Sequence, residues 1–384
     1  MPAEDLRSLL PALGNKHYFN YGGQGPLPAP SLEAMVSCWK ELQRLGPFSR
    51  DVWPFVQAET SALRQRLAQL CGVPPHRLSL TENVTSGCVL PLWGLPFEPG
   101  DTLLLSDAEH PGVVAACQEL ARRQGLSISF FSARDCRSDS AVLESLEAAL
   151  EPSTRLVVLS HLLWNSGLPM PIEAVAARLK QHPRQPWLLV DAAQSLGSLE
   201  LGAVPDVADI YAFTGHKWCC GPEGLGGVVL SERVLEQSQP TLIGWRSLRD
   251  ENAGGSQWHR DGRRFEVATS CIPLGAGLRS SLDLLEQLGS AQQREALIRQ
   301  RSQRLWDGLQ LISSVRTVVQ EVPPASGLVS FTINHAPAPE AVNALADQNF
   351  QLRSLADPLC LRACTHVFST DREIDQLLEA IAQL

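Results

Sequence analysis

Apolar residues along the chain follow two patterns that alternate. Where they recur every three or four positions they predict amphipathic helices, and where they form short unbroken runs they predict buried strands. The first pattern predicts helices over 31–45, 56–70, 111–124, 142–150 and 172–181. The second predicts strands over 102–105, 156–159, 188–190, 210–213 and 228–230. This alternation is typical of an α/β fold, in which helices cover both faces of a mainly parallel sheet.

The pattern changes after about residue 263. One long apolar stretch predicts a helix over 277–308, and three short runs predict strands over 328–333, 350–355 and 359–364. We therefore predict a large domain over 16–262 and a smaller α+β domain that combines 263–384 with the N-terminal residues 1–15.

The composition narrows the class of protein. The chain has 384 residues, of which 44% are hydrophobic, so it can bury a sizeable core. Its 32 basic and 41 acidic residues give a formal charge of -9, which argues against nucleic-acid and anionic-membrane partners. No apolar run reaches the ~20 residues of a membrane span, and the N-terminal segment has no apolar signal core. We therefore expect a cytoplasmic protein that acts on small molecules.

Polar residues follow directly after several predicted strands, at the edge where sheets of this type bind ligands. The run over 210–213 leads into Thr214-Gly-His-Lys217 and then into a glycine-rich turn. A lysine confined there is a candidate Schiff-base residue, because its amine must be shielded to be neutral and nucleophilic. Asp191 directly follows the run over 188–190. A buried carboxylate at that position needs a cation, and a protonated pyridine nitrogen would supply one.

Together, Asp191 and Lys217 resemble the pair found in pyridoxal-phosphate enzymes of the aspartate-aminotransferase fold. Within that fold, Thr-Gly-His-Lys with its trailing Gly-Pro-x-Gly-x-Gly-Gly is similar to the class V aminotransferase and cysteine desulfurase group. The resemblance implies a seven-stranded, mainly parallel sheet between helices, a smaller α+β domain, and pyridoxal 5'-phosphate as the cofactor. Four further blocks resemble the cyst(e)ine C-S lyases of cyanobacteria within this group, at 18–26, 159–167, 243–247 and 352–362.

The resemblance also implies roles for individual residues. Lys217 would hold the cofactor and take the α-proton of the substrate, Asp191 would keep the pyridine nitrogen protonated, and His110 would stack on the pyridine ring. The other residues expected to bind the cofactor are Thr85, Ser86, Asn165, Gln194, Thr214, His216 and Thr269. Thr269 would reach the phosphate in the neighbouring subunit, which implies a homodimer with shared active sites. The residues expected to bind an amino-acid substrate are Gln24, Gly25, Asn165, Trp245, Arg353 and Arg362.

Two of these roles also have a direct chemical basis. Residues 83–87 place small hydroxyl side chains at a predicted helix start, where free N–H groups suit a phosphate, although a plain N-cap has the same composition. Arg353 and Arg362 flank a turn on strands that could pair, and a guanidinium matches the two oxygens of a carboxylate. Arg353 could instead form a surface ion pair. For Gly25 and Trp245, a structural turn and an interface aromatic are equal alternatives.

Cysteine chemistry decides the expected reaction. None of the ten cysteines shows Cys-x-x-Cys spacing, so we expect reduced thiols, most of them in the core, and no metal site. Desulfurases of this group need a mobile thiol, whereas Cys360 and Arg362 are alternate residues on one face of a predicted strand. We therefore predict a lyase that converts cystine, with cysteine as a further candidate, to pyruvate, ammonia and a persulfide or sulfide product.

The released sulfur would pass to an acceptor protein, and the family suggests iron-sulfur cluster assembly as its use. Three alternatives stay open: a cysteine desulfurase or selenocysteine lyase that releases alanine, a class V aminotransferase, and a non-catalytic protein with this fold. Alanine production that depends on Cys360 would indicate the first of them.

Overall fold

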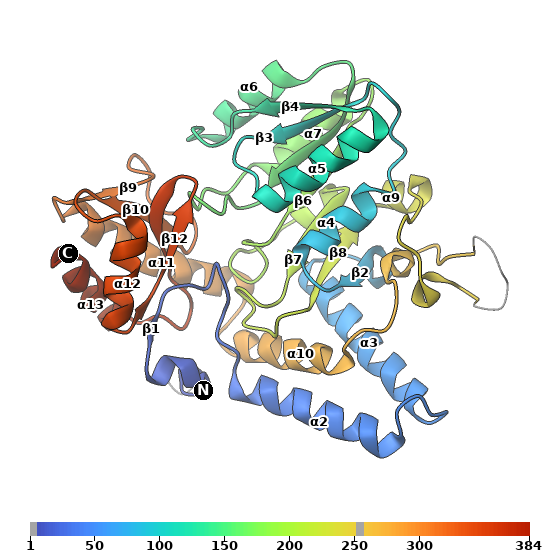
Figure 1. Cartoon of the computed structure of the whole chain (residues 1–384), viewed down its shortest axis with the longest axis horizontal. Coiled ribbons are helices and arrows are strands. Elements are labelled where there is room, and N and C mark those ends of the chain that lie inside the picture. The colour runs from blue at the N-terminus through green and yellow to red at the C-terminus, as the bar shows by residue number, and fades with distance from the viewer. Residues whose placement is uncertain (1–5, 251–256) are drawn as a thin grey trace.

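The computed structural model of the chain describes residues 6–250 and 257–384 (Figure 1). Its main sheet has seven strands in the order β2-β8-β7-β6-β5-β3-β4, and neighbouring strands are parallel except in the two pairs that include β8. The strands are β2 (Leu78–Thr81), β3 (Thr102–Ser106), β4 (Ser127–Phe131), β5 (Thr154–Ser160), β6 (Trp187–Asp191), β7 (Ile210–Thr214) and β8 (Gly226–Leu230). The predicted α/β fold with a mainly parallel sheet is confirmed.

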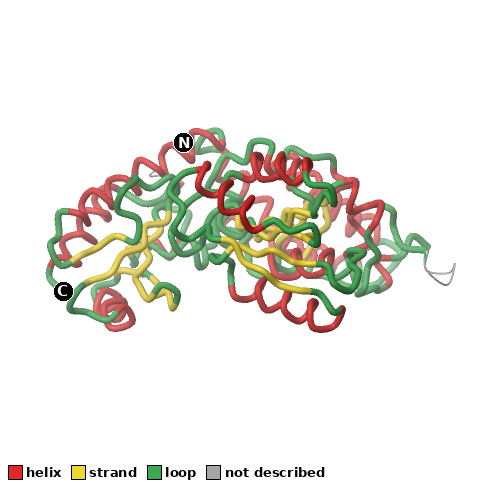
Figure 2. Tube along the Cα trace, turned by 90° about the horizontal axis from the view of Figure 1, so that it is seen from above, coloured by secondary structure: helices red, strands yellow, loops and turns green. Residues whose placement is uncertain are grey.

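Helices cover both faces of this sheet, because successive strand residues point to opposite sides (Figure 2). Leu105 and Val158 pack in one apolar cluster, whereas Leu104 and Val157 pack in another on the opposite face. The first cluster includes residues of α4 (Val84–Leu92), α5 (Pro111–Gln124) and α9 (Glu232–Gln237). The second includes residues of α3 (Val52–Leu70), α6 (Asp139–Ala149), α7 (Ile172–Gln181), α8 (Val204–Val207) and α10 (Ile272–Glu286).

A smaller antiparallel sheet lies in the C-terminal third of the chain, in the order β12-β13-β10-β9. Three helices pack on one of its faces, where Phe331 and Leu361 join Leu377 in a third apolar cluster. These strands and helices are β9 (Val315–Thr317), β10 (Leu328–Ile333), β12 (Arg353–Ala356), β13 (Leu359–Cys364), α11 (Ala291–Gln310), α12 (Ala338–Asp347) and α13 (Asp371–Ala382). The N-terminal strand β1 (His17–Tyr18) pairs in parallel with β11 (Phe350–Gln351) beside this sheet.

Two predicted elements were wrong in detail. The stretch predicted as one helix over 277–308 forms α10 and α11, because the chain turns at Gly289, whose φ is +110°, and α11 begins afresh at a capping box on Ser290. The strand predicted over 350–355 divides at Leu352 into β11, which pairs with β1, and β12, which pairs with β13. The helix is therefore divided by local turn chemistry, and the strand is divided by its pairing with a distant part of the chain.

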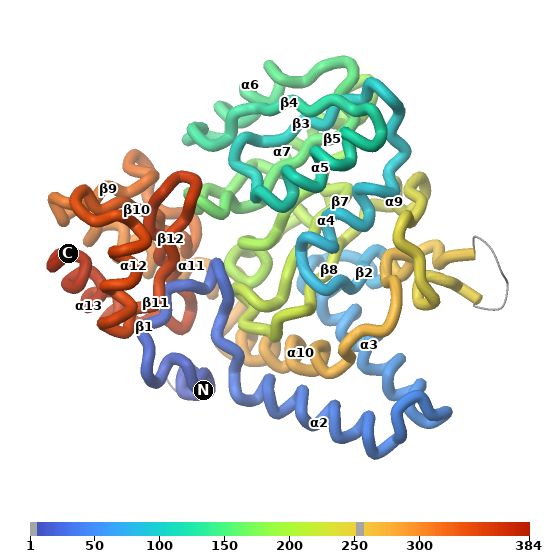
Figure 3. Tube along the Cα trace, viewed as in Figure 1, coloured from blue at the N-terminus to red at the C-terminus, as the bar shows by residue number. Residues whose placement is uncertain are grey.

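The predicted domain boundaries stay a prediction. Helix α10, just beyond residue 263, packs against α2 (Ala29–Leu45) and α3 in the larger part of the molecule (Figure 3). Ser31 and Ser281 join α2 and α10 through a buried hydrogen bond of 2.8 Å. Residues 1–5 of the predicted N-terminal segment lie outside the described residues.

The cysteines are free and mainly buried, as the sequence predicts. All ten cysteines are free, and all except Cys136 and Cys271 are buried. They serve mainly as small core residues, as predicted.

Within 6–250 and 257–384, no helix combines the length and the apolar character that crossing a membrane would require.

Candidate active site at the carboxyl edge of the main sheet

The carboxyl ends of three neighbouring strands carry the polar residues from which the site is built. Ser160 ends β5, Asp191 ends β6 and Thr214 ends β7, and Ser160 lies opposite Asp191 in the register. Asp191 is buried, and its Oδ1 accepts a hydrogen bond of 2.8 Å from the backbone N–H of Ala193. The turn that follows β6 therefore fixes the carboxylate at the edge of the sheet.

Lys217 lies in the loop that follows β7, one strand away from Asp191. Burial lowers the pKa of its amine to about 8, the charge of Asp191 opposes this shift, and the charges of Arg362 and Arg353 add to it. The lysine, the carboxylate and both arginines are therefore within electrostatic reach of one another. An amine with this pKa is available in its neutral, nucleophilic form near neutral pH.

The glycine-rich N-terminal segment, residues 22–25, packs directly on the loop that carries Lys217. Gly25 donates a backbone hydrogen bond of 2.7 Å to the carbonyl of His216, and a Cβ at this position would lie 2.2 Å from the carbonyl oxygen of Lys217. Only glycine permits such a close approach. Next to it, the side chain of Gln24 donates to Glu223. Both residues therefore have a structural role beside the lysine. Their predicted contact with substrate stays a prediction.

The start of α4 lies beside the ends of β7 and β8. Asn83 caps the helix by accepting a hydrogen bond of 2.9 Å from the N–H of Ser86, which leaves Ser86 and Thr85 in the first turn. Gly226 begins β8 and pairs with Thr214. A Cβ atom at Gly226 would lie 3.3 Å from the backbone of Asn83, so the start of α4 packs closely on this part of the sheet. Thr214 Oγ1 lies 2.7 Å from Nδ1 of His216. The first turn of a helix and several hydroxyl side chains thus lie at this edge of the sheet, where a phosphate could bind.

His110 is held in one orientation at the start of α5. Its Nδ1 accepts a hydrogen bond of 3.2 Å from the backbone N–H of Gly112, so the neutral ring carries its proton on Nε2. Partial burial lowers the pKa of His110, the charge of Asp191 opposes this, and the charge of Lys217 adds to it. The ring of Trp164 meets that of His110 edge-on at a centroid distance of 5.8 Å. The imidazole is therefore neutral at neutral pH and close to Asp191 and Lys217.

Asn165 is the buried amide of the loop after β5. Neither its Oδ1 nor its Nδ2 has a hydrogen-bond partner among the described residues. The loop is anchored at Gly167, whose φ is +76° and which leaves no room for a Cβ against Leu328. Ser326 also donates a hydrogen bond of 2.8 Å to the carbonyl of Gly167. Because an unpaired buried amide is costly, a polar group of a ligand is expected at Asn165.

The two predicted carboxylate-binding arginines lie directly opposite each other in the β12–β13 hairpin, so their predicted strand pairing is confirmed. Arg362 is buried and donates a hydrogen bond of 2.7 Å from Nη1 to the carbonyl of Trp164. Its Nε and Nη2 have no hydrogen-bond partner in the described part of the chain. Arg353, by contrast, is exposed. The buried guanidinium can accept an anion such as a carboxylate.

Gln194 links the glycine-rich segment to the lysine loop. Its Nε2 donates a hydrogen bond of 2.9 Å to the carbonyl of Gly22, and its Oε1 accepts one of 2.9 Å from Nε1 of Trp218, which follows Lys217. The predicted contact of Gln194 with the cofactor stays a prediction.

Glu109 is a site residue that the sequence analysis missed. It is buried, and its carboxylate accepts hydrogen bonds from the hydroxyl of Ser106 and from both the N–H and the hydroxyl of Ser160, the latter two at 2.8 Å. Burial raises the pKa of Glu109 to about 7, these hydrogen bonds oppose the shift, and the charge of Asp191 adds to it. The available signal was an acidic residue directly before His110 after a buried strand.

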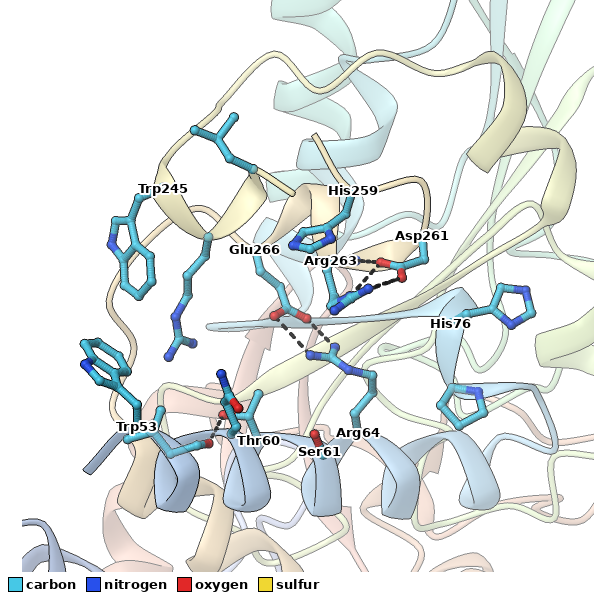
Figure 4. Close-up of a pocket in the computed structure, with 15 residues that line it drawn as sticks. Trp53, Thr60, Ser61, Arg64, His76, Trp245, His259, Asp261, Arg263 and Glu266 are labelled. Carbon is cyan, nitrogen blue, oxygen red and sulfur yellow. Dashed lines mark hydrogen bonds and ion pairs between the residues drawn. The ribbon is translucent and has the colours of Figure 1, made fainter. Parts of the chain in front are cut away.

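Trp245 lies elsewhere, in a cavity of about 470 Å³ between α3 and the short helices η3 (Trp245–Ser247) and η4 (Gly262–Phe265) (Figure 4). Its ring is 6.1 Å from that of Trp53, and Arg64 and Glu266 form an ion pair across the cavity. Lys217 is not among the residues that line this cavity. Thr269 is exposed. The structure therefore does not place Trp245 and Lys217 around one cavity.

Comparison with protein families bears directly on this site. The family model described as aminotransferase class-V matches residues 54–377. The chain belongs to this family. Class V aminotransferases depend on pyridoxal phosphate, as the sequence predicts, so the chain is an enzyme of the class V aminotransferase and cysteine desulfurase type.

Solved structures and sequence relatives refine the placement. A structure of the cystine C-S lyase C-DES with its reaction product cysteine persulfide is 42% identical, with a TM-score of 0.92 over 98% of this chain and 99% of that one. A C-DES mutant with glycine covalently linked to its PLP cofactor is 41% identical, with a TM-score of 0.94 and the same coverage. Isopenicillin N epimerase of Streptomyces clavuligerus is 29% identical over 95% of this chain and 94% of its own. A cysteine desulfurase of Haloferax volcanii is 26% identical over 82% and 76%.

Proposed function

We propose that the protein is a pyridoxal-phosphate-dependent C-S lyase that acts on L-cystine by β-elimination. The observation that carries this choice is the state of Cys360. The thiol is buried in β13, and burial raises its pKa to about 11. A protonated thiol fixed in a strand is a poor nucleophile and cannot carry sulfur away from a substrate, as a desulfurase requires. Similarity to C-DES, which is described as a cystine C-S lyase, supports the same choice.

The residues at the carboxyl edge fit the cofactor. The first turn of α4 offers its N–H groups, with Thr85, Ser86 and Thr214, to the phosphate. Asp191 offers a carboxylate to the pyridine nitrogen, and His110 offers the face of its ring. When bound, pyridoxal phosphate supplies an electron sink for negative charge at the α-carbon of the substrate.

The remaining residues handle the amino acid. Arg362, with Arg353 opposite it, binds the α-carboxylate, and the amide of Asn165 contacts the same carboxylate or the cofactor. Lys217 accepts the α-proton on Nζ, which its lowered pKa leaves free to do so. The β-carbon to sulfur bond then breaks. From cystine the leaving group is a persulfide anion, which leaves more readily than a thiolate because its conjugate acid is stronger. Hydrolysis of the remaining fragment gives pyruvate and ammonia.

The test is incubation of the holoenzyme with L-cystine and, separately, with L-cysteine, followed by assays for pyruvate, ammonia, alanine and sulfide. Equal amounts of pyruvate and ammonia from cystine support the lyase. Alanine without pyruvate would indicate a cysteine desulfurase or selenocysteine lyase instead. Transfer of the amino group to an added keto acid would indicate an aminotransferase. Lys217→Ala is the control, since it removes the proposed base and leaves the other side chains of the site in place.

We also propose a homodimer in which each subunit completes the site of the other. Thr269 is exposed, and the segment beside it exposes the large apolar side chains of Leu242, Ile243 and Trp245. Mixing inactive Lys217→Ala subunits with Thr269→Ala subunits tests this, because one site of each mixed dimer then contains both native groups. A gain of activity on mixing supports shared sites, and a monomer in light scattering contradicts them.

The sulfur released from cystine would pass to an acceptor protein in the cytoplasm, with iron-sulfur cluster assembly as the first use to test. The ten free thiols suit a reducing compartment. Transfer of radiolabelled sulfur from cystine to an apo iron-sulfur protein, in the presence of holoenzyme, measures this directly. Label that stays in small molecules would argue against it.

A further inference from the structure

The loop between β4 and α6 is tied to the segment that carries His110. Asp107, just after β3, accepts hydrogen bonds at its Oδ1 from the backbone N–H groups of Ala133 and Arg134, at 2.8 and 2.9 Å. Arg134 returns a hydrogen bond of 2.9 Å from Nη2 to the carbonyl of Asp107. The guanidinium of Arg134 is therefore fixed relative to the carboxyl edge of the main sheet.

From this position Arg134 reaches across to the smaller sheet. Its Nη1 and Nη2 lie 2.6 and 2.7 Å from Oδ1 and Oδ2 of Asp357, a two-pronged ion pair. The pair lowers the pKa of Asp357. Asp357 occupies the turn between β12 and β13, whose strands carry Arg353 and Arg362. One ion pair thus connects the His110 segment to the hairpin that presents both arginines.

The hairpin needs such a connection at its tip. In the smaller sheet β12 is an edge strand, with β13 as its neighbour on one side. Arg362 is also held by its hydrogen bond to the carbonyl of Trp164, whereas Arg353 on the edge strand is exposed. The edge strand is otherwise held by its pairing with β13 and its packing against α12, so the ion pair at the turn is a direct tie between it and the main-sheet side of the site.

We infer that Arg134 and Asp357 are positioning residues for substrate: their ion pair holds the hairpin at the distance where its arginines grip the α-carboxylate above the carboxyl edge. This inference rests on the proposed function. The ion pair affects how firmly the arginines bind the substrate carboxylate, and it contacts neither the reacting atoms nor the base. Loss of the pair therefore weakens amino-acid binding and leaves the rate of the chemical step nearly unchanged.

The experiment measures binding and turnover separately in holoenzyme. Glycine or L-alanine is titrated while the absorbance of the bound cofactor is followed, which needs no sulfur chemistry, and KM and kcat are measured with L-cystine. For Arg134→Gln and for Asp357→Asn, we expect both Kd and KM to rise roughly three- to tenfold, with kcat within about twofold. The double variant should be no weaker than either single variant, because both remove the same pair. Arg134→Lys should raise Kd and KM less than Arg134→Gln does, since lysine keeps the positive charge but lacks the two parallel N–H donors of arginine.

Two matched variants control for a general loss of stability. Arg304 and Asp375 also form a two-pronged pair, through Nε and Nη2 at 2.8 and 2.7 Å, between α11 and α13. Glu321, which lies outside the hairpin, pairs at 3.5 Å with Arg137 of the same loop as Arg134, and its replacement leaves the hydrogen bond from Arg137 to the carbonyl of Arg134 in place. Asp375→Asn and Glu321→Gln should leave Kd and KM unchanged.

The outcomes separate the inference from the proposed function. Wild-type Kd for glycine should approach the Arg134→Gln value in 1 M salt, because salt screens an ion pair that is part-exposed. Variants that bind glycine as tightly as wild type, or an equal shift in Asp375→Asn, would refute the positioning role. A wild-type holoenzyme that binds glycine but makes no pyruvate from cystine would refute the proposed lyase and leave the positioning role standing.

Discussion

The carboxyl edge of the main sheet and the β12–β13 hairpin contribute to one site but are held in different ways. Asp191 and Lys217 follow central strands that have a neighbour on each side, and backbone hydrogen bonds fix both segments. In the hairpin, β13 with Arg362 also has a neighbour on each side, whereas β12 is an edge strand and leaves Arg353 exposed. Asp191 and Lys217 thus belong to the core of the main sheet, whereas Arg353 belongs to an edge strand with fewer restraints.

This difference suggests how the two tasks are divided. Proton transfer requires the base and the electron sink to keep a fixed geometry, which the core of a sheet provides. Amino acids of different side chain share only their α-carboxylate and amino group, so under the proposed function one buried and one exposed arginine would hold that end of the substrate while the rest varies. Substitutions in the core should therefore affect turnover, and substitutions in the hairpin should affect binding.

The most drastic change to the rigid half is Lys217→Ala. We expect pyruvate formation to fall by roughly 10⁴-fold or more, because the base is lost. The folded pKa of about 8 lies below the ordinary value of 10.5, so the unfolded chain binds more protons between these values. Stability of the wild-type apoprotein should therefore rise with pH across this window, and the variant should lack that rise. Thermal unfolding of both apoproteins at pH 7.5 and pH 10 measures it, and identical pH slopes would contradict the burial of the amine.

The two arginines of the hairpin should differ in importance. Arg362→Ala removes a buried guanidinium, so we expect KM for cystine to rise roughly 100-fold. Arg353→Ala removes an exposed one, and the expected rise is roughly tenfold or less. Steady-state kinetics of the two variants give the comparison directly. A larger effect at Arg353 would mean that the exposed side chain swings in to make the principal contact.

Glu109→Gln tests the pH dependence of the rigid half. The pKa of Glu109 is raised to about 7 from 4.5, so its stabilising contribution is complete below pH 4.5 and is lost as the pH rises through 7. The glutamine side chain of the variant does not ionise, so the variant does not lose stability in this way as the pH rises. The free energy of unfolding of the variant minus that of wild type should therefore increase between pH 5 and pH 7.5, by an amount on the order of 1 kcal/mol. Urea unfolding of both apoproteins measures the change. Glu144→Gln, on the exposed side of α6, is the control and should show none.

The smallest effect is expected at Cys360. Because its thiol is buried and protonated, Cys360→Ala should leave pyruvate formation from cystine within about twofold of wild type. Product analysis by chromatography provides the measurement. Alanine formation in the wild type that disappears in this variant would replace the lyase with a desulfurase.

The sequence was sufficient for those features of the site that are local along the chain. Asp191 follows an apolar run directly and Lys217 follows one after three residues, so the end of a strand and the polar group beyond it are visible together. The pairing of Arg353 with Arg362 could be predicted because nine positions and one turn separate them. The roles of all these residues toward cofactor and substrate remain predictions.

Features that depend on distant contacts could not be predicted in this way. Glu109 receives two of its hydrogen bonds from Ser160, which lies 51 residues further along the chain. The division of the predicted strand at Leu352 depends on pairing with β1 near the N-terminus. The cavity around Trp245 is built from α3 and two short helices more than a hundred residues later.

The pairing of β1 with β11 also has a consequence for the order in which the protein can assemble during translation. Lys16 and Asn349, which join these strands at one end, are 333 residues apart. At about 5–20 residues per second, a ribosome needs roughly 17–67 s to synthesise the intervening chain. Throughout that time the first strand has no partner, while the main sheet can already form. The arginine hairpin, which follows β11 directly, is therefore among the last parts to fold, well after the strands that carry Asp191 and precede Lys217.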